Sequence, residues 1–128
     1  MIGFWLLVSS LSIGQKTFTI EELAQYNGDN GMRYIACDGL VFDVTGVAVY
    51  EPGGSYPMLV GKDITVGLAW NSYEEKWLNT HPYEVKLSPN QQKAVTSWKN
   101  FLEKKYKIVG TIIYPEAEEK LEEKQEEL

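Results

Sequence analysis

The stretch VYEPGGSYPMLVGKD, residues 49–63, decides how the rest of this chain is interpreted. Its first half is typical of an aperiodic loop, because its prolines remove backbone hydrogen-bond donors and its paired glycines permit positive φ angles. Its last residue, Asp63, is suited to cap a helix, which we expect from Ile64 to about Trp70. The segment therefore predicts a loop that carries two tyrosines and leads directly into a short helix.

A helix and a hairpin are predicted upstream of this loop. Thr19 and Glu22 have the spacing of a capping box, in which two residues satisfy each other's backbone donors at the start of a helix. The β-rich runs at 33–37 and 40–44 are joined by Asp38-Gly39, which is a strong signal for a two-residue hairpin turn. We therefore expect two adjacent antiparallel strands before the loop.

The longest helix and the last strand are predicted downstream. Ser88 is suited to cap the helix, with Pro89 at its first position and Gln91 completing a second capping box. Residues 106–113 are expected to form the final strand. The helix has an apolar stripe that we expect to form one buried face. Its members are Ala94, Val95, Trp98, Phe101 and Leu102.

The composition excludes several kinds of chemistry. One cysteine and one histidine among 128 residues provide no intramolecular disulfide, no multi-thiolate zinc site and no bis-histidine haem. No catalytic triad can be assembled around a single histidine flanked by Thr80 and Pro82, so we expect no enzyme activity. The net charge of −6 is concentrated in residues 116–128, which hold seven glutamates against two lysines. No basic stripe is left to bind nucleic acid.

The chain divides into three parts. Residues 1–14 are apolar, uncharged and fewer than the ~20 that a membrane-spanning helix needs. Their length suits the apolar region of a signal peptide, so we expect a secretory signal or membrane anchor, with a buried or merely apolar N-terminus as the alternative. Residues 15–114 form the predicted domain, and 115–128 form an acidic Glu/Lys-rich tail. The expected location is the secretory pathway (endoplasmic reticulum or secreted) or a membrane.

The order of four short motifs resembles one protein family. The motifs are FDVT at 42–45, Pro-Gly-Gly at 52–54, Gly-Lys-Asp at 61–63 and Lys-Tyr at 105–106. Together they resemble the cytochrome b5-like haem/steroid-binding domain, and within it the membrane-associated progesterone receptor (neudesin-like) branch. The resemblance covers Phe18 to about Gly110 and includes the insertion of this branch at 74–87. It implies an α+β fold, with a small mixed sheet and flanking helices that form an open haem pocket.

The resemblance also implies a set of site residues. Electron-carrying cytochrome b5 has a histidine ligand before Pro-Gly-Gly, where this chain has Glu51, and no histidine follows Gly-Lys-Asp. The progesterone-receptor branch implies Tyr56 instead, as the single axial ligand of ferric haem b. A phenol has a pKa near ~10, so Fe(III) must displace its proton. Tyr50 and Tyr106 would form hydrogen bonds in the pocket, and Lys105 would meet a haem propionate.

Each of these residues also has a simpler interpretation. Tyr56 fits a half-packed turn tyrosine, and Tyr50 and Tyr106 fit ordinary core residues. Lys105 fits the preference for cations at a helix C-terminus.

Other residues of note are expected to be structural. We interpret Asp63 as a helix cap, His81 as solvent-exposed and Cys37 as a small strand residue. Trp70, Trp77 and Trp98 are expected in the core or at its rim. None of them is needed as a ligand.

The resulting hypothesis is a non-enzymatic haem-binding module with Tyr56 as ligand. The resemblance implies a link to steroid or sterol metabolism and to haem-thiolate monooxygenase partners. One alternative is a haem-free interaction or secreted signalling domain, which Glu51 favours because an anion near the pocket disfavours a phenolate and propionates. Another alternative is direct binding of a steroid or lipid in an empty apolar pocket.

Overall fold

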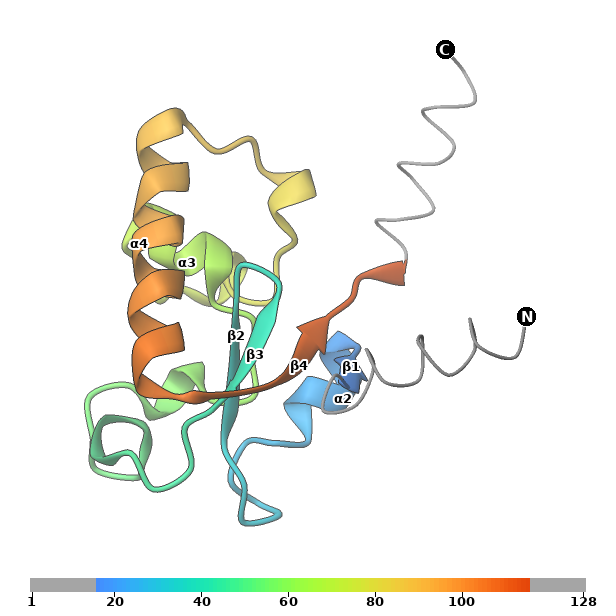
Figure 1. Ribbon diagram of the computed structural model, residues 1–128, viewed down its shortest axis with the longest axis vertical. Coiled ribbons are helices and arrows are strands. Elements are labelled where there is room, and N and C mark those ends of the chain that lie inside the picture. The colour runs from blue at the N-terminus through green and yellow to red at the C-terminus, as the bar shows by residue number, and fades with distance from the viewer. Residues whose placement is uncertain (1–15, 116–128) are drawn as a thin grey trace, which may run out of the picture.

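The computed structural model describes residues 16–115, in which helices pack around one sheet of short strands (Figure 1). In chain order the elements are β1 (Lys16–Phe18), α2 (Ile20–Ala24), β2 (Tyr34–Cys37), β3 (Leu40–Asp43), α3 (Thr65–Trp70), α4 (Pro89–Lys105) and β4 (Lys107–Ile112). Short 3-10 turns lie at Ala48–Tyr50, Pro57–Leu59, Glu75–Trp77 and Pro82–Glu84. The expected N-terminal signal or anchor, and the acidic tail from 116 onward, lie outside the described residues.

The sheet is small and mixed, as the resemblance implies. Its strands are ordered β1-β4-β3-β2, with β1 parallel to β4 and the other neighbours antiparallel. Gly110 of β4 pairs with Lys16 of β1, and a Cβ at Gly110 would lie 2.0 Å from the Lys16 carbonyl oxygen. Only glycine lets the two strands approach this closely.

The predicted hairpin is confirmed. Strands β2 and β3 pair from Tyr34↔Asp43 to Cys37↔Leu40. Asp38 and Gly39 between them have φ angles of 50° and 88°, which are the two positive values that a type I′ turn requires. The turn is tied to α3, because the Thr65 hydroxyl accepts a hydrogen bond from the Asp38 backbone N–H at 2.8 Å.

Both predicted capping boxes are present. At the start of α2 the Thr19 hydroxyl accepts from the Glu22 N–H, and the Glu22 carboxylate accepts from the Thr19 N–H. Ser88 and Gln91 make the same reciprocal pair at the start of α4. These local signals therefore place two helix starts correctly.

The apolar stripe of α4 is only partly buried, so that prediction is wrong in part. Val95 and Leu102 are fully covered, whereas Trp98 and Phe101 are 43% and 44% exposed. Val95 and Leu102 are seven residues apart and so share one narrow line along the helix. Trp98 and Phe101 flank that line, and their rings pack edge-to-face against each other instead.

The fold places one loop beside the end of the long helix. Figure 1 shows α3 and α4 on one side of the β2–β3 hairpin, with α2 and β1 on the other. The green loop between β3 and α3 lies next to the C-terminal end of α4. A core cluster that includes Phe42, Tyr50, Leu59 and Leu102 joins this loop to the sheet and to α4. Among residues 16–115, no helix is long and apolar enough to cross a membrane.

Candidate functional site

Four tyrosine side chains meet beside this core. Tyr50 is buried, and its ring centre lies 6.5 Å from that of Tyr56 and 6.3 Å from that of Tyr106. Tyr73 packs edge-to-face on Tyr56, with ring centres 5.3 Å apart. The structure therefore brings together three of the four predicted site residues, and it adds Tyr73.

Different elements supply these side chains. Tyr50 ends the first 3-10 turn of the loop, and Tyr56 precedes the second, where its backbone N–H donates to the Val49 carbonyl at 2.8 Å. Tyr106 follows the last residue of α4 and donates its N–H to the Leu102 carbonyl at 2.9 Å. Tyr73 comes from the segment after α3. The cluster thus depends on three separate parts of the chain.

Three of the four tyrosines border a small apolar cavity of about 40 Å³. Its lining residues are Tyr50, Tyr56, Leu59, Ile64, Leu68, Tyr73, Trp98 and Leu102. The leucines and the isoleucine come from the core, while Tyr73 and Trp98 are both more than 40% exposed. The cavity therefore has an apolar floor and a rim of two exposed aromatic side chains.

The oxygen atoms that side chains offer to a ligand in this cavity are those of tyrosine phenols. Across residues 16–115, no three His, Cys, Asp or Glu side chains are grouped so that they could hold a metal ion. Burial, followed by the neighbouring Tyr106, raises the pKa of Tyr50 to about 12. Tyr50 is therefore a neutral hydrogen-bond donor at physiological pH. Burial and then the neighbouring Tyr56 raise the pKa of Tyr73 as well.

Lys105 does not join the tyrosines in this structure. It is exposed at the end of α4, and its ammonium lies 5.0 Å from the ring centre of Phe101. No ion pair restrains it among the described residues. Its position next to Tyr106 nevertheless puts an exposed cation near the cluster.

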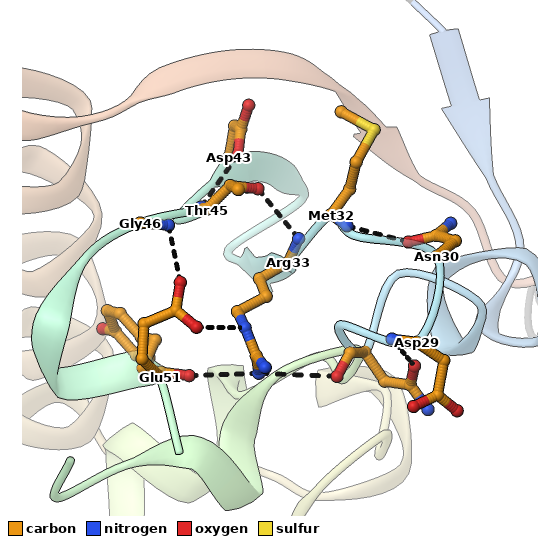
Figure 2. Close-up of polar contacts among 10 residues, drawn as sticks. Asp29, Asn30, Met32, Arg33, Asp43, Thr45, Gly46 and Glu51 are labelled. Carbon is orange, nitrogen blue, oxygen red and sulfur yellow. Dashed lines mark hydrogen bonds and ion pairs between the residues drawn. The ribbon is translucent and has the colours of Figure 1, made fainter. Parts of the chain in front are cut away.

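Glu51 pairs with an arginine outside the cavity. Its carboxylate lies 2.8 Å from the guanidinium of Arg33, and Glu51 is not among the residues that line the tyrosine cavity. Figure 2 shows the Glu51 and Arg33 side chains facing each other. The side chain at the position of the cytochrome b5 histidine is therefore neutralised by a partner. This arrangement weakens the argument that its negative charge disfavours an anionic ligand in the cavity.

Tyr73 was missed from the sequence. It lies two residues after Asn71, which has a left-handed backbone and ends α3, and no element is predicted for this stretch. No periodic or motif signal marks it. Its contact with Tyr56 joins segments 17 positions apart, and only the fold reveals such a contact.

Asp63 lies one residue before the N-cap of α3, so the predicted cap is displaced by one position: Ile64 is the N-cap, without a side-chain cap bond, and the helix begins at Thr65. Asp63 Oδ1 still accepts hydrogen bonds from the Thr65 N–H at 3.0 Å and the Thr65 hydroxyl at 2.6 Å. Asp63 Oδ2 accepts one from the Tyr114 hydroxyl. Asp63 is therefore a buried carboxyl that ties the start of α3, which lines the cavity, to the segment after β4.

Cys37 and His81 are structural in different ways. Cys37 is a buried strand residue as expected, and burial, with the charges of Asp63 and Asp38, raises the pKa of its thiol. His81 is half-buried, not fully exposed as expected. Its ring packs edge-to-face on Tyr114 with centres 4.5 Å apart, and its Nδ1 accepts the Tyr83 N–H at 2.8 Å.

Burial makes Asp63 a source of pH-dependent stability. Its pKa is raised by burial, although hydrogen bonds from Thr65 and Tyr114 oppose this. The folded state therefore holds the Asp63 proton more tightly than the unfolded state. The unfolding free energy should fall as the pH rises from the ordinary carboxyl pKa through the raised one, by about 1.4 kcal/mol per unit of difference.

Asp63→Asn tests this expectation, because asparagine keeps an oxygen for Thr65 and does not titrate. Its unfolding free energy, measured with urea across acidic to neutral pH, should increase relative to the wild type as the pH rises. Asp29→Asn, at an exposed position, is the control and should follow the wild type. A constant difference between Asp63→Asn and the wild type at every pH would show that Asp63 keeps an ordinary pKa.

Comparison with known proteins identifies the chain's relatives. Residues 19–112 match the sequence model of the "Cytochrome b5-like Heme/Steroid binding domain". The chain is 34% identical over 107 residues to the Schizosaccharomyces pombe cytochrome P450 regulator dap1, covering 78% of this chain and 64% of that protein. It is also 34% identical over 107 residues to human membrane-associated progesterone receptor component 2, covering 81% of this chain and 48% of that protein. The chain thus spans about half to two thirds of these relatives.

A solved structure supports the same assignment. An Arabidopsis thaliana protein described as having a cytochrome b5 like fold superimposes with a TM-score of 0.69 at 34% sequence identity. The alignment covers 79% of this chain and 94% of the other. The fold expected from the sequence is therefore confirmed, and the relatives' names are those of a regulator and a receptor component, not of enzymes.

Proposed function

Because this chain belongs to the cytochrome b5-like haem/steroid-binding domain family, we propose that it is a non-enzymatic module that binds one ferric haem b through Tyr56. The observation that carries the proposal is that Tyr50 and Tyr56 line an apolar cavity while Tyr106 packs edge-to-face on Tyr50. Bound there, ferric haem supplies a Lewis-acidic iron, and an anionic oxygen ligand favours its Fe(III) state.

The tyrosines have distinct roles in this proposal. Tyr56 is half-buried and lines the cavity, with Tyr73 packed against its ring. In this proposal its hydroxyl turns from Tyr73 to the iron. Tyr50, with its pKa raised to about 12, remains a neutral donor, and Tyr106 beside it provides a second phenol. Lys105 supplies a positive charge for a propionate.

The cavity has to widen to admit a macrocycle. Sites for ligands of drug size measure about 300–1,000 Å³, far above the 40 Å³ found here. Trp98 and Tyr73 form the exposed rim and can move without uncovering the core, whereas Leu68 and Leu102 stay as the floor. The two rim side chains therefore open the cavity, and the aliphatic residues exclude water from the ligand.

The relatives suggest where such a module works. A regulator of cytochrome P450 and a membrane-associated receptor component point to haem-thiolate monooxygenases as partners, and to steroid or sterol metabolism as context. The apolar residues 1–14 fit a location in the secretory pathway or at a membrane. The open side of the cavity would face the partner or a small ligand.

The proposal is tested by titrating the full chain with haemin and recording absorbance. We expect saturable 1:1 binding with a ferric high-spin spectrum, together with partial quenching of tryptophan fluorescence, because Trp98, one of four tryptophans, lines the cavity. A folded protein that shows no saturable binding would refute the proposal and favour a haem-free interaction domain.

Direct steroid binding is the second candidate, since the family is named for both ligands. Progesterone is a suitable probe and should be titrated into the haem-free chain and into the haem complex. If haem is the ligand of this cavity, excess progesterone should leave the Soret band unchanged. If progesterone binds the haem-free chain and displaces haem, the cavity is a steroid site.

A further inference from the structure

The most extensive polar cluster around the loop is centred on Arg33. This residue precedes β2, and its side chain is only 15% exposed. Its Nε lies 2.8 Å from Glu51 Oε2, and its Nη1 donates to the Tyr50 carbonyl at 3.3 Å and the Asn27 carbonyl at 3.5 Å. We call Arg33 and these three partners the Arg33 clamp. Figure 2 shows the Arg33 side chain reaching to the Glu51 carboxylate.

Glu51 closes the clamp on the loop itself. While Oε2 pairs with Arg33, Oε1 accepts the backbone N–H of Gly46 at 2.9 Å. Both ends of the segment 46–51 are therefore held by one carboxylate. Gly28 makes room for the arginine, since a Cβ at this position would lie 2.6 Å from the guanidinium carbon.

The clamp is connected to both site tyrosines through the backbone. Tyr50 is held directly, by its own carbonyl. From Glu51 the chain turns back on itself, because Gly54 donates to the Glu51 carbonyl at 2.9 Å and Tyr56 donates to the Val49 carbonyl at 2.8 Å. Hydrogen bonds of the backbone therefore connect the clamp to both tyrosines.

We propose that the Arg33–Glu51 pair is a positioning device that holds Tyr50 and Tyr56 in place for the ligand of the cavity. This inference rests on the proposed function and assigns a role to the residue at the former histidine position. At this position Glu51 fixes the loop that carries Tyr56, through its bonds to Arg33 and to the Gly46 N–H. Arginine is suited to this task because its planar group bonds several oxygens at fixed angles, which a lysine ammonium does not.

Glu51→Gln tests the proposal with a small change. Arg33 and Gly46 bond to different oxygens of the carboxylate, and glutamine has an NH2 group in place of one of them, so one of these two donors then faces another donor. We expect haem to dissociate at least about tenfold faster, because a partly buried, hydrogen-bonded charge pair is broken. In the haem-free protein, the backbone amides of Gly54 and Tyr56 should exchange with deuterium about tenfold faster.

Two further variants separate positioning from general damage. Glu74→Gln removes the same charge from an exposed pair with Lys76, whose side chains are 67% and 64% accessible, and should change neither rate. Arg33→Lys keeps the charge but loses the fork that reaches Tyr50, so it should lie between the wild type and Glu51→Gln. Its ferric absorbance spectrum should shift, whereas a purely structural loss would lower occupancy and leave the spectrum of the bound fraction unchanged.

The outcomes distinguish this inference from the proposed function. If the wild type binds haem and Glu51→Gln has the same haem dissociation rate and the same amide exchange rates, the positioning role of the clamp is refuted and the proposed haem binding is not. If the wild type binds no haem, the proposed function fails, and the amide exchange of Glu51→Gln alone decides the clamp. Equal exchange in Glu51→Gln and Glu74→Gln would then refute it.

Discussion

Replacing Tyr56 with phenylalanine is expected to lower the affinity for haemin by more than about 100-fold while leaving the fold intact. Loss of an outer partner of a metal ligand already costs about 10–100-fold in affinity, so loss of the ligand itself should cost more. The ring contacts with Tyr50 and Tyr73 survive the change. The unfolding free energy should therefore stay within about 1 kcal/mol of the wild type.

Absorbance titration with haemin should compare Tyr56→Phe with two other variants, so that loss of the ligand is distinguished from loss of any phenol. Tyr83→Phe removes an exposed phenol that does not line the cavity and should bind like the wild type. Tyr50→Phe removes a donor whose raised pKa makes it a poor phenolate, so it should bind more weakly but keep the wild-type spectrum. Tight binding by Tyr56→Phe would mean that another phenol ligates, and Tyr73 would be the first to replace.

The parts of the fold that the sequence predicted well are those decided by short-range chemistry. Thr19 and Glu22 recognise each other across three residues, as do Ser88 and Gln91, so both helix starts are visible in four-residue windows. The Asp38-Gly39 turn is equally local, because its positive φ angles restrict which residues fit. The identity of the domain came from the order of its motifs.

The parts that the sequence did not predict depend on contacts between distant segments. Trp98 and Phe101 satisfy the helical period of α4, yet the surface that covers this helix reaches only Val95 and Leu102. Periodicity reports which residues share a face, not how wide the covering surface is. Tyr73 was missed for a different reason, because it lies in a loop and its contact with Tyr56 joins two separate segments.

The pairing of Arg33 with Glu51 was also not predicted from the sequence. The residues are 18 positions apart, and each fits an ordinary surface charge when taken alone. From the sequence, Glu51 counted against an anionic ligand. In the folded chain Arg33 pairs with it, so charge near a site has to be judged together with its partners.

Gly54→Ala is expected to be the most damaging small substitution in the loop. A Cβ at Gly54 would lie 2.3 Å from the Ala48 carbonyl oxygen and 2.7 Å from that of Val49. Both are backbone atoms, so a rotamer change cannot relieve the overlap. The Val49 carbonyl also accepts the Tyr56 N–H, so a shift of this carbonyl should displace Tyr56, the proposed axial ligand. We expect a loss of about 3 kcal/mol in stability and at least about tenfold in haemin affinity.

Gly53→Ala is the matched control, because it separates backbone strain from overlap at the neighbouring position. Gly53 has a φ of 90°, which strains alanine, but a Cβ there meets nothing within 4 Å. It should lose only about 1–2 kcal/mol and bind haemin within about threefold of the wild type. Urea unfolding and haemin titration of both variants give the comparison. Equal damage from the two substitutions would mean that the φ angles of the loop, and not the contact between Gly54 and residues 48–49, hold Tyr56 in place.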